Sequence, residues 1–302
     1  MQTATDHRHE TAPTQFIEAS GIRYAYRRFG RASTVPLLFL GYFNSNMDAW
    51  DPEVTNGLAA DHEVILFDNA GVGASAGETP NTVVEMTRHC AAFCRALGVK
   101  AIHVVGLSLG GMIAQQLALD HPNLVERLIL LGTAPRGGEG LTFTELSPEE
   151  QADPVAFLLA AFFAPSDNSQ KAGREYLKRL EFREKDRDLP VSRNSAVAQL
   201  AAIREWGVVP ATGRYSTLAK ITHPTLIVHG NKDIVVGPIN ALILAERLPN
   251  AQLIVYPDSS HGAQDQHAKT FLQHVELFLA DTHARVSDSS SRPAKSAVVL
   301  SE

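Results

Sequence analysis

The segment Gly106-Leu107-Ser108-Leu109-Gly110 places a serine between two glycines, where an apolar run gives way to a helix-like run. A serine hydroxyl is a weak nucleophile, so it reacts only when a base and a site for an anion are held beside it. A sharp turn from a strand into a helix provides this arrangement, because glycines allow the crowded backbone and the first helical N–H groups are free to bind an oxyanion. The pattern predicts that Ser108 is a nucleophile.

The same pattern occurs a second time, at Gly73-Ala74-Ser75-Ala76-Gly77. A chance match to so short a pattern is expected in roughly one of every ten chains of this length. Ser75 lies well past the preceding apolar run and is followed by turn residues as far as Pro80 rather than by a helix-like run. The context therefore favours Ser108 and predicts that Ser75 is a structural residue of a loop.

A nucleophilic serine needs a histidine as its base and an acid that orients the histidine. Asp233 closes the segment His229-Gly230-Asn231-Lys232-Asp233 after one apolar run, and His261 follows the next apolar run. Open α/β sheets bind ligands at the carboxyl ends of their strands, where all three side chains would lie. Asp258 is the rival acid, but it belongs to the same loop as His261. We therefore predict a catalytic triad of Ser108, Asp233 and His261.

Six short apolar runs bounded by turn residues have the pattern of strands that are buried on both faces. They cover residues 35–40, 63–67, 101–105, 127–131, 225–228 and 252–256. Helix-like segments follow most of these runs, at residues 80–97, 109–120, 238–247 and 264–280. An additional hairpin is expected over residues 15–29. This alternation predicts an α/β protein with a mostly parallel, doubly wound sheet and helices on both faces.

About 90 residues between Gly132 and Thr225 contain no good strand. We predict a helical cap over residues 138–219, inserted between the two parts of an α/β core at 14–137 and 220–280, with flexible tails at 1–13 and 281–302. The charge run Lys178–Asp188 is interpreted as a solvated helix face. The apolar band Phe157–Phe163 is predicted to form a lid, although it could equally pack only against the core.

The composition excludes several classes of protein. With 302 residues, 44% of them apolar and 20% charged, the chain is globular rather than disordered or coiled-coil. A net charge of −6 and the absence of a long basic run argue against nucleic acid as a partner. Cys90 and Cys94 lie on one face of an expected helix without enough further ligands nearby, so no metal site is expected. No signal peptide or membrane span is recognised, which makes the cytoplasm the expected compartment.

Two further segments add to the triad. Asp68-Asn69-Ala70-Gly71-Val72-Gly73-Ala74-Ser75 resembles a D-x-R-G-x-G-x-S loop, with Ala70 in place of the arginine. Leu40-Gly41-Tyr42 resembles a His-Gly-x loop, with Leu40 in place of the histidine. Residues 14–280 thus resemble the α/β-hydrolase superfamily, in its small capped esterase, lactonase and haloperoxidase-like branch.

This resemblance implies that the backbone N–H groups of Tyr42 and Leu109 form the oxyanion hole. It also implies a cofactor-free serine hydrolase that cleaves a small carboxylic ester or lactone through an acyl-enzyme. Related dehalogenases and epoxide hydrolases use aspartate as the nucleophile, so Ser108 argues against both. Gly71, Gly73 and Ala76 match a dinucleotide-binding pattern, but no helix begins directly after them. Nucleotide binding is therefore not expected.

Two alternatives stay open. The same triad serves carbon–carbon bond hydrolysis of a diketone or perhydrolysis, and the same scaffold serves a non-catalytic ligand-binding protein. The sequence predicts neither the substrate nor the oligomeric state.

Overall fold

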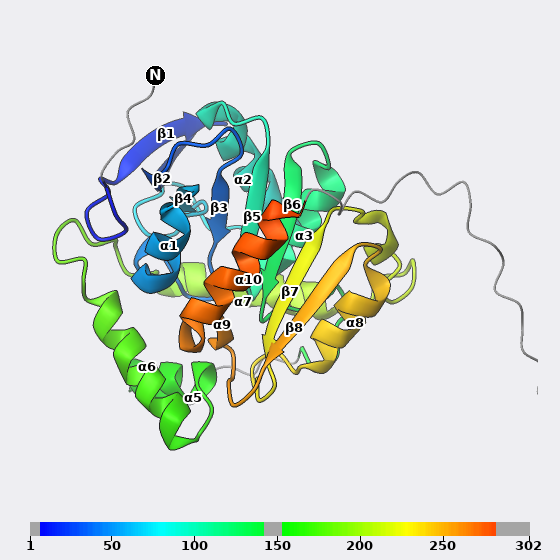
Figure 1. Cartoon of the computed structure of the whole chain (residues 1–302). Coiled ribbons are helices and arrows are strands. Elements are labelled where there is room, and N and C mark those ends of the chain that lie inside the picture. The colour runs from blue at the N-terminus through cyan, green and yellow to red at the C-terminus, as the bar shows by residue number, and fades with distance from the viewer. Residues whose placement is uncertain (1–6, 142–152, 282–302) are drawn as a thin grey trace, which may run out of the picture.

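The computed structural model describes residues 7–141 and 153–281, and within them eight strands form one sheet. The strands are β1 (Gln15–Ala19), β2 (Ile22–Gly30), β3 (Leu37–Leu40), β4 (Glu63–Phe67), β5 (Ile102–Leu107), β6 (Val125–Leu131), β7 (Thr225–Gly230) and β8 (Ala251–Tyr256). Their order across the sheet is β1-β2-β4-β3-β5-β6-β7-β8 (Figure 1). The six strands β4, β3, β5, β6, β7 and β8 pair in parallel with one another. Strand β2 pairs antiparallel with both β1 and β4. The predicted mostly parallel sheet and its N-terminal hairpin are confirmed.

The strand order reverses direction between β3 and β5. From β3 the chain crosses to β4 on one side, and from β5 it continues to β6, β7 and β8 on the other side. Such a switch point leaves a crevice at the carboxyl ends of the two central strands, where open α/β sheets bind their ligands. The loop after β3 and the turn after β5, which carries Ser108, therefore lie on either side of this crevice.

Helices cover both faces of the sheet. They are α1 (Pro52–Ala59), α2 (Val83–Leu97), α3 (Leu109–Asp120), α5 (Pro154–Phe162), α6 (Asp167–Leu180), α7 (Arg193–Gly207), α8 (Ile239–Arg247), α9 (Ala263–Gln266) and α10 (Ala268–Ala280), with the short 3₁₀ turns η1 (Met47–Ala49) and η2 (Leu218–Lys220). Neighbouring residues of β3 point to opposite faces of the sheet. Leu38 packs with α2 and α3 on one face, and Leu37 packs with α1 and α10 on the other. Burial on both faces explains why the strands are continuous apolar runs.

The helix boundaries follow local capping chemistry. Helix α2 begins after Thr82, whose side chain accepts a hydrogen bond from Glu85 N at 3.2 Å, and ends at Gly98, which has a φ of +75°. A side-chain N-cap and a left-handed glycine at the other end are common helix terminators. Both cysteines lie buried in this helix. The expected helix at 264–280 is instead two helices, because the chain breaks at His267 between α9 and α10.

The predicted insertion contains three helices in its described part, α5, α6 and α7, between β6 and β7. Helix α7 contacts α2 and α3, and α6 contacts α1 and α9, so the insertion bridges elements from both faces of the sheet (Figure 1). The apolar band predicted over Phe157–Phe163 is mostly helix α5. Residues 142–152 of the expected cap and 282–302 of the expected C-terminal tail lie outside the described residues.

The interpretation of Lys178–Asp188 as a solvated helix face is correct for solvent exposure, since most of these residues are exposed, but wrong for the helix and for Arg183. Helix α6 ends at Leu180, and Arg183 is only 3% exposed. Its Nη1 donates to the carbonyls of Glu10 and Ala12, at 3.3 and 2.9 Å. Buried carbonyls need donors, and a guanidinium supplies several at once. This contact also packs part of the expected N-terminal tail, since Ala12 is fully buried.

A pair of buried carboxyl groups joins the insertion to the core. Asp68 follows β4, Asp188 lies between α6 and α7, and an oxygen of each side chain would contact a Cβ placed on Gly73. Both of these Oδ2 atoms are buried and have no partner unless a proton lies between the two carboxyl groups. Burial, followed by the hydrogen bond and charge of Asp188, raises the pKa of Asp68 well above its ordinary value. Asp68 is therefore the group that keeps the shared proton.

This pair should make the stability of the protein depend on pH. An unfolded aspartate releases its proton near pH ~3.9, whereas folded Asp68 keeps it, so the pair stabilises the fold at low pH and loses that contribution as pH rises through the raised pKa. Asp68→Asn should remove this dependence, because an amide donates to Asp188 at every pH. We expect the variant to be more stable at neutral pH by about 1 kcal/mol. Urea unfolding between acid and neutral pH measures both effects.

The exposed Asp61→Asn serves as the matched control and should leave the pH dependence of stability unchanged. The shared proton would be contradicted by two results together. These are a wild-type free energy of unfolding that rises from acid to neutral pH, and the same pH dependence in Asp68→Asn.

Candidate active site

Ser108 occupies a strained turn between β5 and α3. Its φ is +55° and its ψ is −113°, a backbone conformation that non-glycine residues rarely adopt. Its N–H donates to Leu131 O at 2.9 Å, and its carbonyl accepts from Thr133 Oγ1 at 2.7 Å. The end of β6 therefore holds the turn in place. Strain of this kind persists only where the surroundings fix it, and it is concentrated at functional sites.

The glycines around Ser108 are required by close backbone approaches. A Cβ on Gly106 would lie 2.5 Å from the Gly110 carbonyl oxygen. A Cβ on Gly110 would overlap the carbonyl of Leu40. The first turn of α3 thus lies directly against the loop that follows β3, which brings the Ser108 turn and the Tyr42 loop together.

Ser75, the second serine of this pattern, is used structurally. Its Oγ donates to Asp68 O at 2.7 Å and accepts from Ala25 N at 2.8 Å. The side chain thereby ties the loop after β4 to β2. This geometry agrees with the sequence-based expectation for Ser75.

Asp233 and His261 meet beyond the ends of β7 and β8. The distance between His261 Nδ1 and Asp233 Oδ2 is 2.8 Å, and both side chains are buried. The other oxygen of Asp233 accepts the N–H groups of Val235 and Val236, both at 2.9 Å. With Nδ1 donating to the carboxylate, the lone pair of His261 lies on Nε2. Asp258, the rival acid, instead accepts from Ser166 Oγ at 2.6 Å, at the start of α6.

Asp233 is held in its ionised form. Burial alone would raise its pKa, but the charge of His261 and the hydrogen bonds from His229 and His261 outweigh burial and hold the pKa below its ordinary value. His229 was not predicted as a site residue, although it begins the segment that supplies Asp233. Its Nε2 lies 2.7 Å from Val236 O and 3.2 Å from Asp233 Oδ2. A second histidine ring beside the same carboxylate could not be recognised before the fold brought it there.

The end of β6 places the serine and the histidine near each other. Leu131, the last residue of β6, accepts the hydrogen bond from Ser108 N. A Cβ on the next residue, Gly132, would lie 3.0 Å from Nδ1 of His261. The structure thus brings the three predicted triad residues to neighbouring strand ends.

The two N–H groups predicted as oxyanion donors flank the serine turn. Leu109 is the first residue of α3, so its N–H has no partner inside the helix. Tyr42 lies in the loop after β3, where Ser45 Oγ donates to its carbonyl at 2.7 Å. A Cβ on Gly41 would lie 2.5 Å from the same Ser45 oxygen. Ser45 therefore holds a loop in which Leu40 stands at the histidine position of the family pattern.

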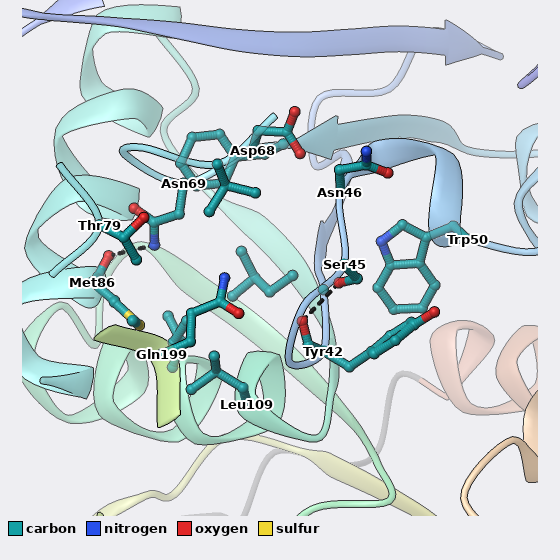
Figure 2. A pocket seen from close by; sticks show the side chains of 15 residues that line it. Tyr42, Ser45, Asn46, Trp50, Asp68, Asn69, Thr79, Met86, Leu109 and Gln199 are labelled. Carbon is teal, nitrogen blue, oxygen red and sulfur yellow. Dashed lines mark hydrogen bonds between the residues drawn. The ribbon is translucent and has the colours of Figure 1, made fainter. Parts of the chain in front are cut away.

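A cavity opens beside this loop, on the β4 side of the serine turn (Figure 2). Besides Gly41, Tyr42 and Leu109, its apolar walls come mainly from Leu40, Trp50, Phe67, Val72, Met86 and Ile113. Its polar side chains are Ser45, Asn46, Asp68, Asn69, Thr79 and Gln199. Gln199 comes from α7 of the insertion, so the insertion closes part of this cavity. We call this space the β4-side cavity.

Phe162 of α5 lies against the predicted base. The centroids of its ring and the His261 ring are 5.4 Å apart and the rings are nearly perpendicular, and its centroid is 4.9 Å from that of Tyr42. Two backbone hydrogen bonds fix this contact: His261 N donates to Ala161 O at 3.2 Å, and Gly262 N donates to Phe162 O at 2.9 Å. Phe163 points elsewhere and packs on Tyr176 of α6.

Residues 7–141 and 153–281 show neither a cluster of metal ligands nor a membrane-spanning helix. No three His, Cys, Asp or Glu side chains in this part of the chain are grouped as ligands of a metal ion would be. None of the helices described there has the length and hydrophobicity needed to cross a membrane.

Comparison with known proteins agrees with this geometry. A 2-hydroxymuconate semialdehyde hydrolase from Pseudomonas putida is 30% identical over 226 residues, covering 73% of this chain and 78% of that protein. The solved structure of an alpha/beta hydrolase fold protein from Chitinophaga pinensis has a TM-score of 0.85 and 39% identity, covering 91% of this chain and 99% of its own. The N-acyl homoserine lactone degrading enzyme Est816 has a TM-score of 0.68 and 27% identity, covering 87% and 100% of the two chains. The family model for the alpha/beta hydrolase fold matches residues 35–268. The chain therefore belongs to the α/β hydrolase fold family.

Proposed function

We propose that this protein is a cofactor-free serine hydrolase that cleaves a small carboxylic ester or lactone through an acyl-enzyme. The observation that carries the proposal is the buried Asp233–His261 pair, 2.8 Å between Oδ2 and Nδ1, placed beside the strained Ser108 turn. A base oriented by an ionised carboxylate beside a serine on a sharp strand-to-helix turn is the arrangement that activates a hydroxyl for acyl transfer.

In the first half of the reaction, Ser108 Oγ adds to the substrate carbonyl carbon and its proton passes to His261 Nε2. The carbonyl electron pair moves onto oxygen, where the Tyr42 and Leu109 N–H groups stabilise it. The intermediate then collapses, the bond to the leaving alcohol oxygen breaks, and that oxygen takes the proton from Nε2. Asp233 stabilises the imidazolium formed in between and does not itself take up the proton.

In the second half, water replaces the alcohol. Its proton passes to His261 Nε2 as its oxygen adds to the acyl carbon. The new oxyanion accepts hydrogen bonds from the same two N–H groups. Collapse releases the carboxylic acid and returns the proton to Ser108 Oγ. His229 is a positioning residue in this scheme, since its Nε2 is hydrogen-bonded to Val236 O and lies 3.2 Å from the Asp233 oxygen that faces His261.

The insertion supports an apolar environment for the alcohol part of the substrate. Phe162 contacts the His261 ring, and the leaving oxygen must lie next to His261 to receive its proton. An apolar wall there favours apolar alcohol groups, at about 0.8 kcal/mol per buried methylene. The similarity to Est816, an N-acyl homoserine lactone degrading enzyme, is consistent with a lactone or ester substrate.

The similarity to 2-hydroxymuconate semialdehyde hydrolase supports a second candidate, hydrolysis of a carbon–carbon bond by the same triad. A panel of aryl esters, lactones and diketones assayed with wild type and Ser108→Ala separates the candidates. Turnover of esters or lactones that is lost in Ser108→Ala supports the first proposal, and turnover of diketones alone supports the second. A folded wild type that turns over none of them would indicate a binding protein.

The first test concerns the nucleophile. A fluorophosphonate should label Ser108 and not Ser75, and Ser108→Ala should lower kcat by about 10³-fold or more. Ser75→Ala should retain labelling but lose about 1–3 kcal/mol of stability, because it leaves buried backbone groups unpaired. Peptide mapping by mass spectrometry locates the adduct. An adduct on Ser75, or full turnover by Ser108→Ala, would overturn the assignment.

The second test concerns the acid. Asp233→Asn should lower kcat by about 10³- to 10⁴-fold, because an amide no longer fixes the required tautomer of His261. Asp258→Asn, the matched control, should stay within about tenfold of wild type, since its partner is Ser166. Steady-state kinetics with both folded variants checks the order. Greater damage from Asp258→Asn would move the acid to that residue.

The third test concerns the lid. In a series of esters with lengthening straight-chain alcohols, kcat/KM should rise by about fourfold per methylene until the alcohol side is full. Phe162→Ala should flatten this rise. Phe163→Leu should preserve it, because Phe163 packs inside the insertion. If kcat/KM falls from the shortest alcohol onward, or Phe162→Ala keeps the wild-type profile, α5 is only a packing element.

A further inference from the structure

The β4-side cavity lies on one side of the predicted oxyanion hole and His261 lies on the other. The cavity is lined by Phe67, Asp68 and Asn69 at the end of β4, and Tyr42 and Leu109 also face it. In the sheet order β4-β3-β5-β6-β7-β8, the elements carrying Asp233 and His261 follow the strands at the opposite end. Neither His261 nor Phe162 lines the cavity.

This placement decides which part of a substrate the cavity receives. The leaving group must lie on the His261 side, because its oxygen takes the proton from Nε2. The oxyanion accepts hydrogen bonds from the Tyr42 and Leu109 N–H groups. The remaining substituent of the reacting carbon, the acyl chain, must then extend toward β4 and into the cavity.

Most carboxyl, amide and hydroxyl groups lining the cavity are already paired within the protein. Ser45 Oγ donates to Tyr42 O, and Asn46 Nδ2 donates to Leu189 O. Asn69 Nδ2 donates to Met86 O, at 3.0 Å. Asp68 Oδ1 accepts from Met47 N, and its Oδ2 faces Asp188.

Gln199 is different, because only half of its amide is used. Helix α7 buries the side chain, which is 4% exposed, and Oε1 accepts the N–H of Asn44 at 2.7 Å. This bond fixes the orientation of the amide and turns Nε2 toward the middle of the lining side chains (Figure 2). Nε2 donates to no other atom in the described part of the chain. Thr79 Oγ1 on the wall formed after β4 is buried and has no partner among the described residues.

We propose that Gln199 selects acyl groups that carry a hydrogen-bond-accepting oxygen, an oxo or hydroxy group, within the β4-side cavity. Apolar walls from Leu40, Val72 and Ile113 hold the chain, and Gln199 Nε2 donates to the distal oxygen. Thr79 Oγ1 is a second group able to pair with that oxygen. A donor that faces the cavity and is left unpaired by a plain acyl chain penalises that chain relative to the oxygenated one. This proposal rests on the proposed function.

The test compares nitrophenyl alkanoates of one chain length in plain form and with an oxo or hydroxy group at each successive carbon. Wild type should show a kcat/KM about tenfold higher for at least one oxygenated ester than for the plain ester. Gln199→Glu keeps the oxygen that accepts from Asn44 and replaces the donor by an acceptor, so the ratio should fall to about one or below. Gln199→Met, which removes both functions, should also bring the ratio to about one.

Val197→Glu is the matched control, because it adds the same charge to α7 at a position that is 62% exposed. This control should keep the wild-type ratio. A wild-type ratio near one for every ester, or an unchanged ratio in folded Gln199→Glu and Gln199→Met, would overturn the role of Gln199. A Ser108→Ala variant that still hydrolyses the plain ester would instead overturn the proposed function, so the two failures are distinguishable.

Discussion

The contact between the first turn of α3 and the loop after β3 governs the geometry of the candidate site. Gly110 lies so close to the Leu40 carbonyl that no side chain fits between them. In the same turn Ser108 has a φ of +55° and a ψ of −113°, and the Leu109 N–H lies beside the Tyr42 loop. Without this contact, the Tyr42 N–H would not lie beside Ser108 and Leu109. The free energy of strain is therefore localised where the proposed chemistry occurs.

The switch point of the sheet gives the site two unequal sides. Strand β4 lies on one side of the central pair and β7 and β8 lie on the other. The acid and base come from the β7–β8 side, and the cavity with Gln199 comes from the β4 side. The insertion reaches both: Phe162 contacts His261, whereas α7 delivers Gln199. In the proposed reaction, the core thus determines where the carbonyl reacts, and the insertion shapes the space for its two substituents.

Much of this architecture could be predicted from local patterns. The apolar runs at 63–67 and 252–256 coincide with β4 and β8 to within a residue, because burial on both faces leaves a continuous apolar signal. The proximity of Asp233 to His261 was also predictable, since both follow strands of one parallel sheet. Arg183, Asp188 and Gln199 were not, because their partners lie more than 100 residues away in the sequence. Their roles depend on packing of the insertion, and nothing in a local charge pattern distinguishes a buried arginine from a solvated one.

The hydrogen bonds that join α5 to the His261 loop have a mechanical consequence. His261 N, Gly262 N and Ser260 Oγ all donate to the carbonyls of Ala161 and Phe162, the last at 2.6 Å to Ala161. Any swing of α5 away from the sheet must break these three bonds or drag the imidazole with it. Helix α5 and the proposed base are consequently linked on this side of the site. An opening motion that leaves the His261 ring in place therefore has to occur elsewhere in the insertion. In the proposed function, a substrate could then enter at the end that carries α7 without displacing the proposed base.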